Sequence, residues 1–298
     1  MIKRTLYFGN QAYLSLKDNQ LVIKKRDDEI VTAAIEDIAY IVLDSPQITV
    51  TNALLGALLE NNCAIINCDK THLPSGLLLP LSGNTLQSER FQAQIEASLP
   101  LKKQLWQQTV QQKILNQAAI LKNARNAEIG NMTAWANSVR SGDVDNREAI
   151  AAAYYWKEMF PDVPDFIRDR NGVPPNNMLN YGYAILRGVV ARALVSSGLL
   201  PTLGIHHHNR YNAYCLADDI MEPYRPIVDK LVIDILAEIK EYPKDLSTDI
   251  KAKILQIPVL DCFINGERSP LMNAVATTTA SLAKCYMGVT KKLIYPEV

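Results

Sequence analysis

The sequence lacks any run of 18 or more apolar residues, which argues against a membrane-spanning helix. Residues 1–15 include two basic side chains but no long apolar segment and no small-residue cleavage site, so they do not resemble a secretory signal. We therefore expect no membrane partner and a cytoplasmic location. Charge is also not in excess, because 31 Lys and Arg balance 31 Asp and Glu. A neutral chain gives no global sign of nucleic-acid binding, although a local basic stripe can contact phosphates.

Cysteines are few and show no pairing pattern. The chain has five cysteines, an odd number, and no C-x-x-C pair. Most are flanked by apolar residues, which is typical of buried thiols and not of disulfides or a zinc site. The sequence also lacks G-x-x-x-x-G-K-[ST] and G-x-G-x-x-G motifs, a G-x-S-x-G elbow and paired Glu-x-x-His motifs. Nucleotide hydrolysis, dinucleotide binding, serine-hydrolase and di-iron chemistry therefore have no support.

Hydrophobic periodicity separates a β-rich part from a helical part. In the first 80 residues, short β-branched and aromatic runs end at regularly spaced turn signals, which predicts a β-sandwich-like domain over residues 1–75. Strands are expected at 4–8, 12–16, 21–25, 29–34, 38–43, 64–68 and 77–81. One helix, at 51–61, is predicted to pack on these strands through its leucines.

A linker is predicted at residues 76–90, which are rich in Pro, Ser, Gly and Asn. The periodicity then becomes helical, and residues 91–298 are expected to form a larger all-α domain. Its helices are predicted at 101–123, 127–139, 143–160, 178–197, 226–241, 246–255 and 270–287. The predicted fold class is therefore α+β with two domains.

Histidines and carboxylates are concentrated in residues 203–229. In this stretch His206–His208 are followed by Asp218, Asp219 and Glu222. Asp219 and Glu222 are three residues apart and would share a face of a helix. Imidazoles and carboxylates at this density favour a divalent metal site. The simpler interpretation is a solvated histidine turn followed by acids at the start of a capped helix.

Glu148 lies in the first turn of a predicted helix whose N-cap is expected to be Asp145 or Asn146. One interpretation is a glutamate that caps the helix. The other is a carboxylate that a helical bundle brings to the histidine-rich stretch, since metal sites in bundles use side chains from several helices. An ion held by Glu148, His207 and Glu222 could act as a Lewis acid on a phosphodiester.

Residues 161–177 are predicted to form a loop that contains four prolines and a pair of arginines, Arg168 and Arg170. The arginines could contact phosphate. They could equally form ion pairs with Asp165 and Asp169 in a solvated loop.

Three separated blocks of sequence resemble the family of CRISPR-associated integrases, CRISPR-associated protein one. The blocks are Asn146-x-Glu148-Ala149, Gly204-Ile205-x-His207-His208-Asn209 and Leu216-Ala217-Asp218-Asp219-x-x-Glu222-Pro223-Tyr224-Arg225-Pro226. They occur in the family's order, and the resemblance extends over the whole chain. The residues of these blocks are most similar to those of family members from type II systems, which accompany a single-protein RNA-guided effector.

This resemblance implies a metal-dependent DNA integrase, or endonuclease, that acts in CRISPR adaptation and antiviral defence. Members insert a short prespacer duplex into a CRISPR repeat by transesterification at its 3′-hydroxyl ends. The implied partners are prespacer and repeat DNA, a second copy of the chain in a homodimer, and CRISPR-associated protein two. Other type II adaptation proteins and the RNA-guided effector nuclease are further implied partners.

By position, the resemblance makes Glu148, His207 and Glu222 the metal ligands and catalytic residues, with Mg²⁺ or Mn²⁺ as the ion. Asp219 matches a supporting acid. His206 stands where relatives usually carry an aromatic or aliphatic residue, so His207, fifteen residues before Glu222, is preferred. His207 could bind the ion or protonate the leaving oxygen. A local basic surface is expected to contact DNA; it comprises Arg140, Arg147, Arg168, Arg170 and Lys284.

Two alternatives from other functional classes stay open at the level of sequence. The same site would serve a metal-dependent nuclease that cuts branched DNA without integrating it. A non-catalytic scaffold for DNA capture would instead use residues 206–222 as a structural turn.

Overall fold

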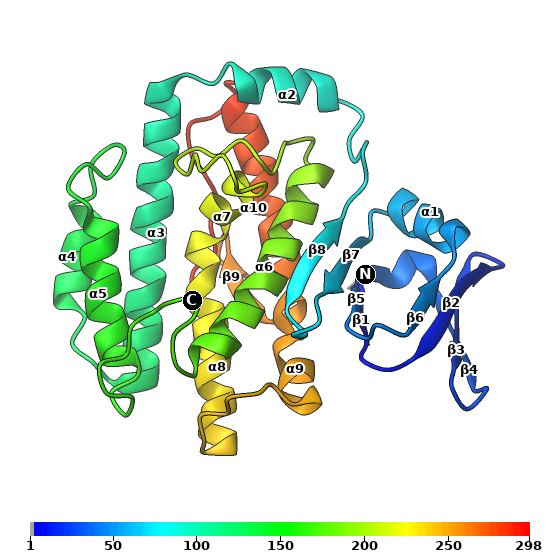
Figure 1. The fold of residues 1–298 in the computed structure, drawn as a ribbon. Coiled ribbons are helices and arrows are strands. Elements are labelled where there is room, and N and C mark those ends of the chain that lie inside the picture. Colours follow the sequence, from blue (N-terminus) through cyan, green and yellow to red (C-terminus); the bar gives the residue numbers. More distant parts are fainter. Residues whose placement is uncertain (1–2) are drawn as a thin grey trace. The chain divides into compact units, whose positions relative to one another are not determined.

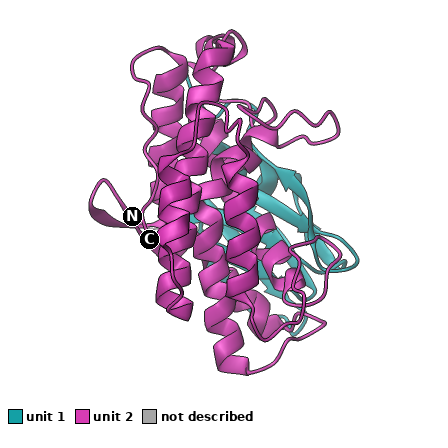
Figure 2. Ribbon diagram, turned by 90° about the vertical axis from the view of Figure 1, so that its left-hand side faces the viewer, with its two compact units in different colours: residues 1–85 teal, residues 86–298 magenta. Residues whose placement is uncertain are grey.

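The computed structural model describes residues 3–298, so the first two residues of the predicted β domain lie outside it. The chain divides into one compact unit that ends at Thr85 and a second unit from Leu86 to Val298 (Figure 2). The first unit is rich in strands and the second is mainly helical. The α+β fold class is therefore confirmed. In the part of the chain described here, no helix is long and apolar enough to cross a membrane.

Two four-stranded sheets make up most of the first unit (Figure 1). One sheet has the order β1-β5-β7-β8 and the other the order β4-β3-β2-β6. The bounds of the first are Arg4–Phe8, Ile38–Leu43, Ala64–Cys68 and Pro74–Leu78. The bounds of the second are Ile30–Ala34, Gln20–Lys25, Ala12–Lys17 and Ile48–Val50. Strand β8 begins three residues before the predicted strand at 77–81, and the short strand β6 was not predicted at all.

Local chemistry explains the β2–β3 hairpin and the core of this unit. Asp18 and Asn19 both have positive φ, as the two-residue turns that match the twist of a hairpin require. Helix α1 (Asn52–Glu60) buries Leu54 and Leu58. These leucines join residues of both sheets in one apolar cluster, so the two sheets and the helix share a core.

The second unit consists mainly of helices that pack on one another (Figure 1). The long helices α3 (Leu99–Arg125), α6 (Asn176–Ser196), α8 (Arg225–Ile239) and α10 (Leu271–Tyr286) form most of its core. The shorter elements are α2 (Gln87–Ile95), α4 (Gly130–Asn137), α5 (Arg147–Met159), α7 (Cys215–Met221), η2 (Glu222–Tyr224) and α9 (Thr248–Ile254). Helix α3 packs against α4, α5, α8 and η2, so it lies at the centre of the elements that carry the predicted site.

The prediction of an all-α second domain is wrong in one place. Strands β9 (Asp261–Ile264) and β10 (Glu267–Pro270) form an antiparallel hairpin. Its turn, Asn265-Gly266, has positive φ at both positions and is a strong hairpin signal that the helical periodicity around it obscured. Residues 76–90, expected to be a linker, include the end of β8 and the start of α2.

Candidate active site

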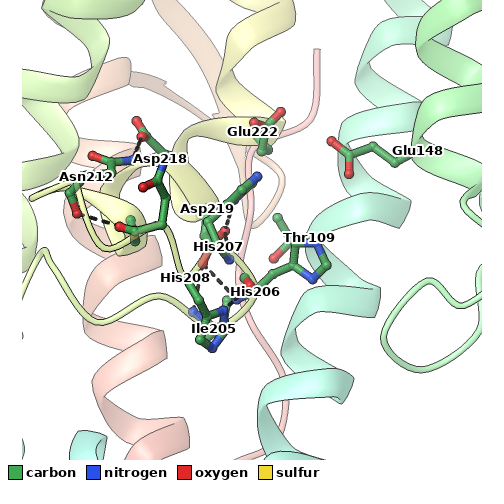
Figure 3. Close-up of polar contacts among 12 residues, drawn as sticks. Thr109, Glu148, Ile205, His206, His207, His208, Asn212, Asp218, Asp219 and Glu222 are labelled. Atoms are coloured by element: carbon green, nitrogen blue, oxygen red, sulfur yellow. Dashed lines mark hydrogen bonds and ion pairs between the residues drawn. The ribbon is translucent and has the colours of Figure 1, made fainter.

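The histidine loop is organised by one buried carboxylate. Asp219, on α7, is fully buried and accepts three backbone N–H groups, from Ile205 (2.7 Å), His206 (2.9 Å) and His207 (3.2 Å). It also accepts a hydrogen bond from Nδ1 of His207 at 2.5 Å. Figure 3 shows the loop gathered around this side chain. The histidine stretch is therefore not a free solvated turn, and Asp219 is not a simple helix-start acid.

Gly204 allows the loop to pass this close to Asp219. A Cβ atom at this position would lie 2.3 Å from the carbonyl oxygen of His207 and 2.8 Å from Oδ2 of Asp219. Because one of these neighbours is backbone, a larger residue would displace the loop. Glycine is required here for close approach, whatever its dihedral angles.

The two histidines between which the sequence analysis chose have different surroundings. His206 stacks flat on Trp106 of α3, with ring centroids 4.1 Å apart and an interplanar angle of 2°. Burial lowers the pKa of His206. The hydrogen bond that His207 donates to Asp219 raises the pKa of His207, and the charges of Asp219, Glu222 and Glu148 add to the effect. His207 is thus the imidazole that lies within the field of both glutamates.

Glu222 begins η2, directly after α7, and is almost completely buried. Its Oε1 lies 3.0 Å from the guanidinium of Arg225, and its Oε2 lies 2.6 Å from Nζ of Lys113. Burial raises the pKa of Glu222, but the charges of Arg225 and Lys113 outweigh it and hold the pKa below the usual range. Glu222 is therefore a buried, ionised carboxylate between two cationic side chains.

Glu148 lies in the first turn of α5, and its side chain points toward Glu222 (Figure 3). The expected capping residues are corrected by the structure. Asn146 is in the left-handed region and makes no capping bond, and Asp143 instead accepts from the N–H groups of Arg147 (2.9 Å) and Glu148 (3.0 Å). The Glu148 carboxylate is not used for capping and accepts from Nζ of Lys113 at 2.6 Å.

Lys113 is a residue of this candidate site that the sequence analysis missed. It lies on α3, with its side chain only 10% exposed, and contacts both glutamates. Burial lowers the pKa of Lys113, but Glu222 and Glu148 raise it more, so the ammonium stays charged. The signal in the sequence was its spacing: Trp106, Val110 and Lys113 continue one helical stripe, where a solvated lysine would not be expected.

The donor set fits a hard or borderline divalent ion. Oε2 of Glu222 is buried and lacks a hydrogen bond of normal geometry, and its carboxylate is ionised. Two carboxylates and one imidazole are ligands that such ions accept. In the described residues, however, no three Asp, Glu, His or Cys side chains already converge as a ligand set. Lys113 stands between the two glutamates, and Nδ1 of His207 is bound to Asp219.

Asp218 contributes to the loop on the side away from the glutamates. It accepts from Nε of Arg187 and from Nδ2 of Asn212, both at 2.7 Å. These bonds fix the end of the histidine loop against α6.

The predicted DNA-contacting residues are not equivalent in the structure. Arg170 and Lys284 are exposed. Arg140 is exposed and forms an ion pair with Asp145. Arg147 is half-buried, and its Nε has no hydrogen-bond partner among residues 3–298.

Arg168 is engaged inside the protein. Its guanidinium donates to the side-chain oxygens of Asn176 (3.0 Å) and Asn180 (2.8 Å) and lies 5.0 Å from the centre of the Tyr183 ring. These contacts tie the loop after α5 to α6. In the described part of the chain, Arg168 forms no ion pair with the carboxylates of Asp165 and Asp169, and it donates instead to the backbone oxygen of Asp169.

A family model and a relative of known name both match this chain over most of its length. A family model described as CRISPR associated protein Cas1 matches residues 6–265. The CRISPR-associated endonuclease Cas1 of Neisseria meningitidis serogroup C (strain 8013) is 38% identical over 303 residues, which cover 100% of this chain and 97% of that protein.

Solved structures are similar in fold. A casposase bound to an integration product superposes with a TM-score of 0.79 at 21% identity, covering 98% of this chain and 92% of that one. A chain of a Cas6-RT-Cas1–Cas2 complex gives a TM-score of 0.77 at 19% identity, covering 99% of this chain and 36% of the longer one. At these identities the likeness shows the fold alone.

Proposed function

Because the chain belongs to the CRISPR-associated protein Cas1 family, we propose that it is a metal-dependent DNA integrase that inserts prespacer DNA into a CRISPR repeat array. In this reaction a 3′-hydroxyl of the prespacer attacks a repeat phosphodiester. A new P–O bond forms at that phosphorus as its P–O bond to the 3′-oxygen of the preceding nucleotide breaks, so no ATP is needed. The observation that carries the proposal is that the carboxylates of Glu148 and Glu222 meet at Nζ of Lys113, and that both carboxylates act electrostatically on His207.

The proposed ligands are Glu148, Glu222 and Nε2 of His207. Asp219 fixes the histidine ring by accepting from Nδ1, which directs the other nitrogen away from the carboxylate. A bound Mg²⁺ or Mn²⁺ would supply Lewis-acid chemistry, lowering the pKa of the attacking hydroxyl and neutralising charge at phosphorus. If His207 is not a ligand, its imidazolium could protonate the leaving oxygen, which its raised pKa favours.

A strand-transfer assay tests this function. The purified protein, with the family's small partner protein, is incubated with a 3′-end-labelled duplex and a supercoiled plasmid that carries the repeat. We expect covalent transfer of the label to the plasmid, and loss of transfer in Glu148→Gln and His207→Ala. Glu241→Gln, at an exposed glutamate, is the control that should keep activity. Full activity in either site variant would remove that residue from the proposed role.

A second candidate is cleavage of branched DNA without integration, which the name endonuclease carried by the Neisseria relative favours. The same assay separates the two. A nuclease releases fragments and joins no label to the plasmid, whereas an integrase yields a joined product whose length reports the insertion point.

We further propose that the chain works as a homodimer with the small CRISPR-associated protein two and with DNA. The fold that it shares with a chain of a Cas1–Cas2 complex supports this assignment. Exposed basic residues, Arg170 and Lys284 in particular, are the proposed phosphate contacts. Co-purification of the two tagged proteins and light scattering of the complex test the partner and the dimer.

A further inference from the structure

Lys113 occupies an unusual place for an ammonium group. Its Nζ lies 2.6 Å from Oε1 of Glu148 and 2.6 Å from Oε2 of Glu222. Lys113 lies on α3, Glu148 lies on α5 and Glu222 lies on η2. Three separate elements therefore meet at this nitrogen atom. The ammonium therefore joins the two carboxylates that would otherwise repel each other.

The charges of the four groups that form ion pairs at this point already balance. Glu148 and Glu222 carry two negative charges, and Lys113 and Arg225 carry two positive ones. A divalent ion added to this group would leave two uncompensated positive charges in a largely buried place. Buried charges are tolerated when they are paired, so either the ion stays out or a cation leaves.

Of the two cations, Lys113 is the one that can leave. The guanidinium of Arg225 is fixed by Glu222 at 3.0 Å and lies 4.9 Å from the centre of the Tyr183 ring. Lysine has a flexible four-carbon stem with a compact charge at its end. The Glu148 side chain beside it is 23% exposed, against 4% for Glu222, so the way out to solvent runs past Glu148.

We propose that Lys113 is the internal counter-ion of the active site, and that its ammonium and a divalent ion exclude each other from the gap between Glu148 and Glu222. An Mg²⁺ ion lies about 2.1 Å from its oxygen ligands, so the two centres cannot share the same pair of carboxylate oxygens. Metal binding then requires the lysine to turn away. This inference rests on the metal site of the proposed function and adds to it a residue that opposes the metal.

The test is a measurement of Mn²⁺ affinity on the full-length chain, by calorimetry and by electron paramagnetic resonance of free Mn²⁺. Lys113→Met keeps most of the length of the side chain but removes the charge and offers no hard ligand. We expect its Kd for Mn²⁺ to be about 10- to 100-fold lower than that of the wild type, the size of effect that groups around metal ligands have. Lys113→Arg keeps the charge and should not tighten binding. Lys122→Met, at an exposed lysine of the same helix, is the matched control.

A second readout uses thermal unfolding. Without metal, Lys113→Met should unfold at a lower temperature than the wild type, because the two glutamates lose their counter-ion. Mn²⁺ should raise its Tm by more than it raises that of the wild type, because binding to the native state stabilises it. If Lys113→Met does not fold, Lys113→Gln takes its place in both measurements.

Equal or weaker Mn²⁺ binding by Lys113→Met, with normal binding by the wild type, would overturn the inference and leave the metal site intact. Glu148→Gln and Glu222→Gln test the site itself, and both should bind Mn²⁺ poorly whatever stands at position 113. Mn²⁺ binding that survives in both glutamine variants would reject the metal site of the proposed function. Absence of Mn²⁺ binding from every variant would reject both proposals.

Discussion

Nδ1 of His207 is hydrogen-bonded to Oδ1 of Asp219 at 2.5 Å, and the carboxylate that accepts this bond is completely buried. The imidazole itself is 45% exposed. The ring is therefore oriented from the inside of the protein, while its far edge stays open to a ligand. A histidine positioned in this way keeps one tautomer and one direction, which is what both a metal ligand and a proton donor need.

Asp219→Asn should disrupt this arrangement. The amide would present an N–H₂ group to backbone N–H donors that now meet a carboxylate, and a buried donor without a partner is costly. We expect a loss of about 2 to 4 kcal/mol in the free energy of unfolding, measured with urea. The His207 pKa should fall toward its ordinary value, as nuclear magnetic resonance would show. Asp245→Asn, at an exposed aspartate, should change neither quantity.

The pH dependence of this defect has a definite sign. The hydrogen bond with Asp219 raises the His207 pKa above that of the unfolded chain. A raised histidine pKa stabilises the native state fully below the unfolded value of 6.5 and no longer once the pH exceeds the folded value. The stability gap between wild type and Asp219→Asn should therefore be wider at pH 5.5 than at pH 8.5. A constant gap would mean that the imidazolium adds nothing to the pair.

Much of the fold could be predicted from the sequence because its elements have strong local signals. The strands Arg4–Phe8, Ile38–Leu43 and Ala64–Cys68 have the predicted bounds, since turn residues bracket β-branched runs. Helix α3 was predicted two residues short at each end. Strand β6 was missed because three residues are too few to show a period, and it exists only through its pairing with β2.

The site was less predictable because its key contacts are long-range. The histidine–carboxylate stretch drew attention through composition alone, but nothing in a sequence shows that Lys113 reaches Glu148, 35 residues away, and also Glu222. Asp143 was overlooked as the cap of α5 because it lies four residues before the first residue of the helix. Its carboxylate accepts from the N–H groups of Arg147 and Glu148, across the intervening residues 144–146. The only sign of a buried lysine was its position in sequence, since Lys113 continues the helical stripe of Trp106 and Val110.

Gly204→Ala should damage the histidine loop. The added Cβ would lie 2.3 Å from the His207 carbonyl oxygen, so the loop has to move away from Asp219. We expect a loss of about 1 to 3 kcal/mol in stability, typical of overpacking a fitted site, together with loss of strand transfer. Gly56→Ala is the matched control, because Gly56 stands inside α1 and no atom beyond the neighbouring backbone of that helix lies within 4 Å of the added Cβ. That variant should gain up to about 1 kcal/mol from helix propensity. Equal stability changes in the two variants would contradict the close-approach argument.

The two glutamates should differ in their effect on stability. Glu222→Gln leaves Arg225 and Lys113 without their shared buried partner, and breaking a buried pair costs about 3 to 5 kcal/mol. Glu148→Gln removes a carboxylate that is 23% exposed and leaves Lys113 its contact with Glu222. We expect it to cost about 1 kcal/mol. Urea unfolding measures both, and a larger loss from Glu148→Gln would show that the buried network is not centred on Glu222.

Asp229 forms a second buried cluster, next to the site on α8. Its two oxygens accept hydrogen bonds from Tyr183 (2.6 Å) and Tyr155 (2.9 Å). Arg168 and Arg225 both lie against the Tyr183 ring. Burial raises the pKa of Asp229 to about 6, although the hydrogen bonds from the two tyrosines and the charges of the arginines oppose the shift. The cluster thus links the loop after α5 to the residue that holds Glu222.

The raised pKa of Asp229 makes stability depend on pH in a direction opposite to ordinary acid denaturation. The folded chain holds this proton up to about pH 6, whereas the unfolded chain releases it near 3.8. The stabilisation is therefore complete below the unfolded value and is lost as the pH rises through 6. A shift of about two pKa units corresponds to about 3 kcal/mol.

Asp229→Asn cannot titrate, so the stability of the wild type relative to this variant should fall by about 2 to 3 kcal/mol between pH 4 and pH 7. Urea unfolding at four pH values measures the difference, with Asp245→Asn as the control that should run parallel to the wild type. A difference that rises with pH would mean that the tyrosines and arginines, and not burial, decide the charge of Asp229.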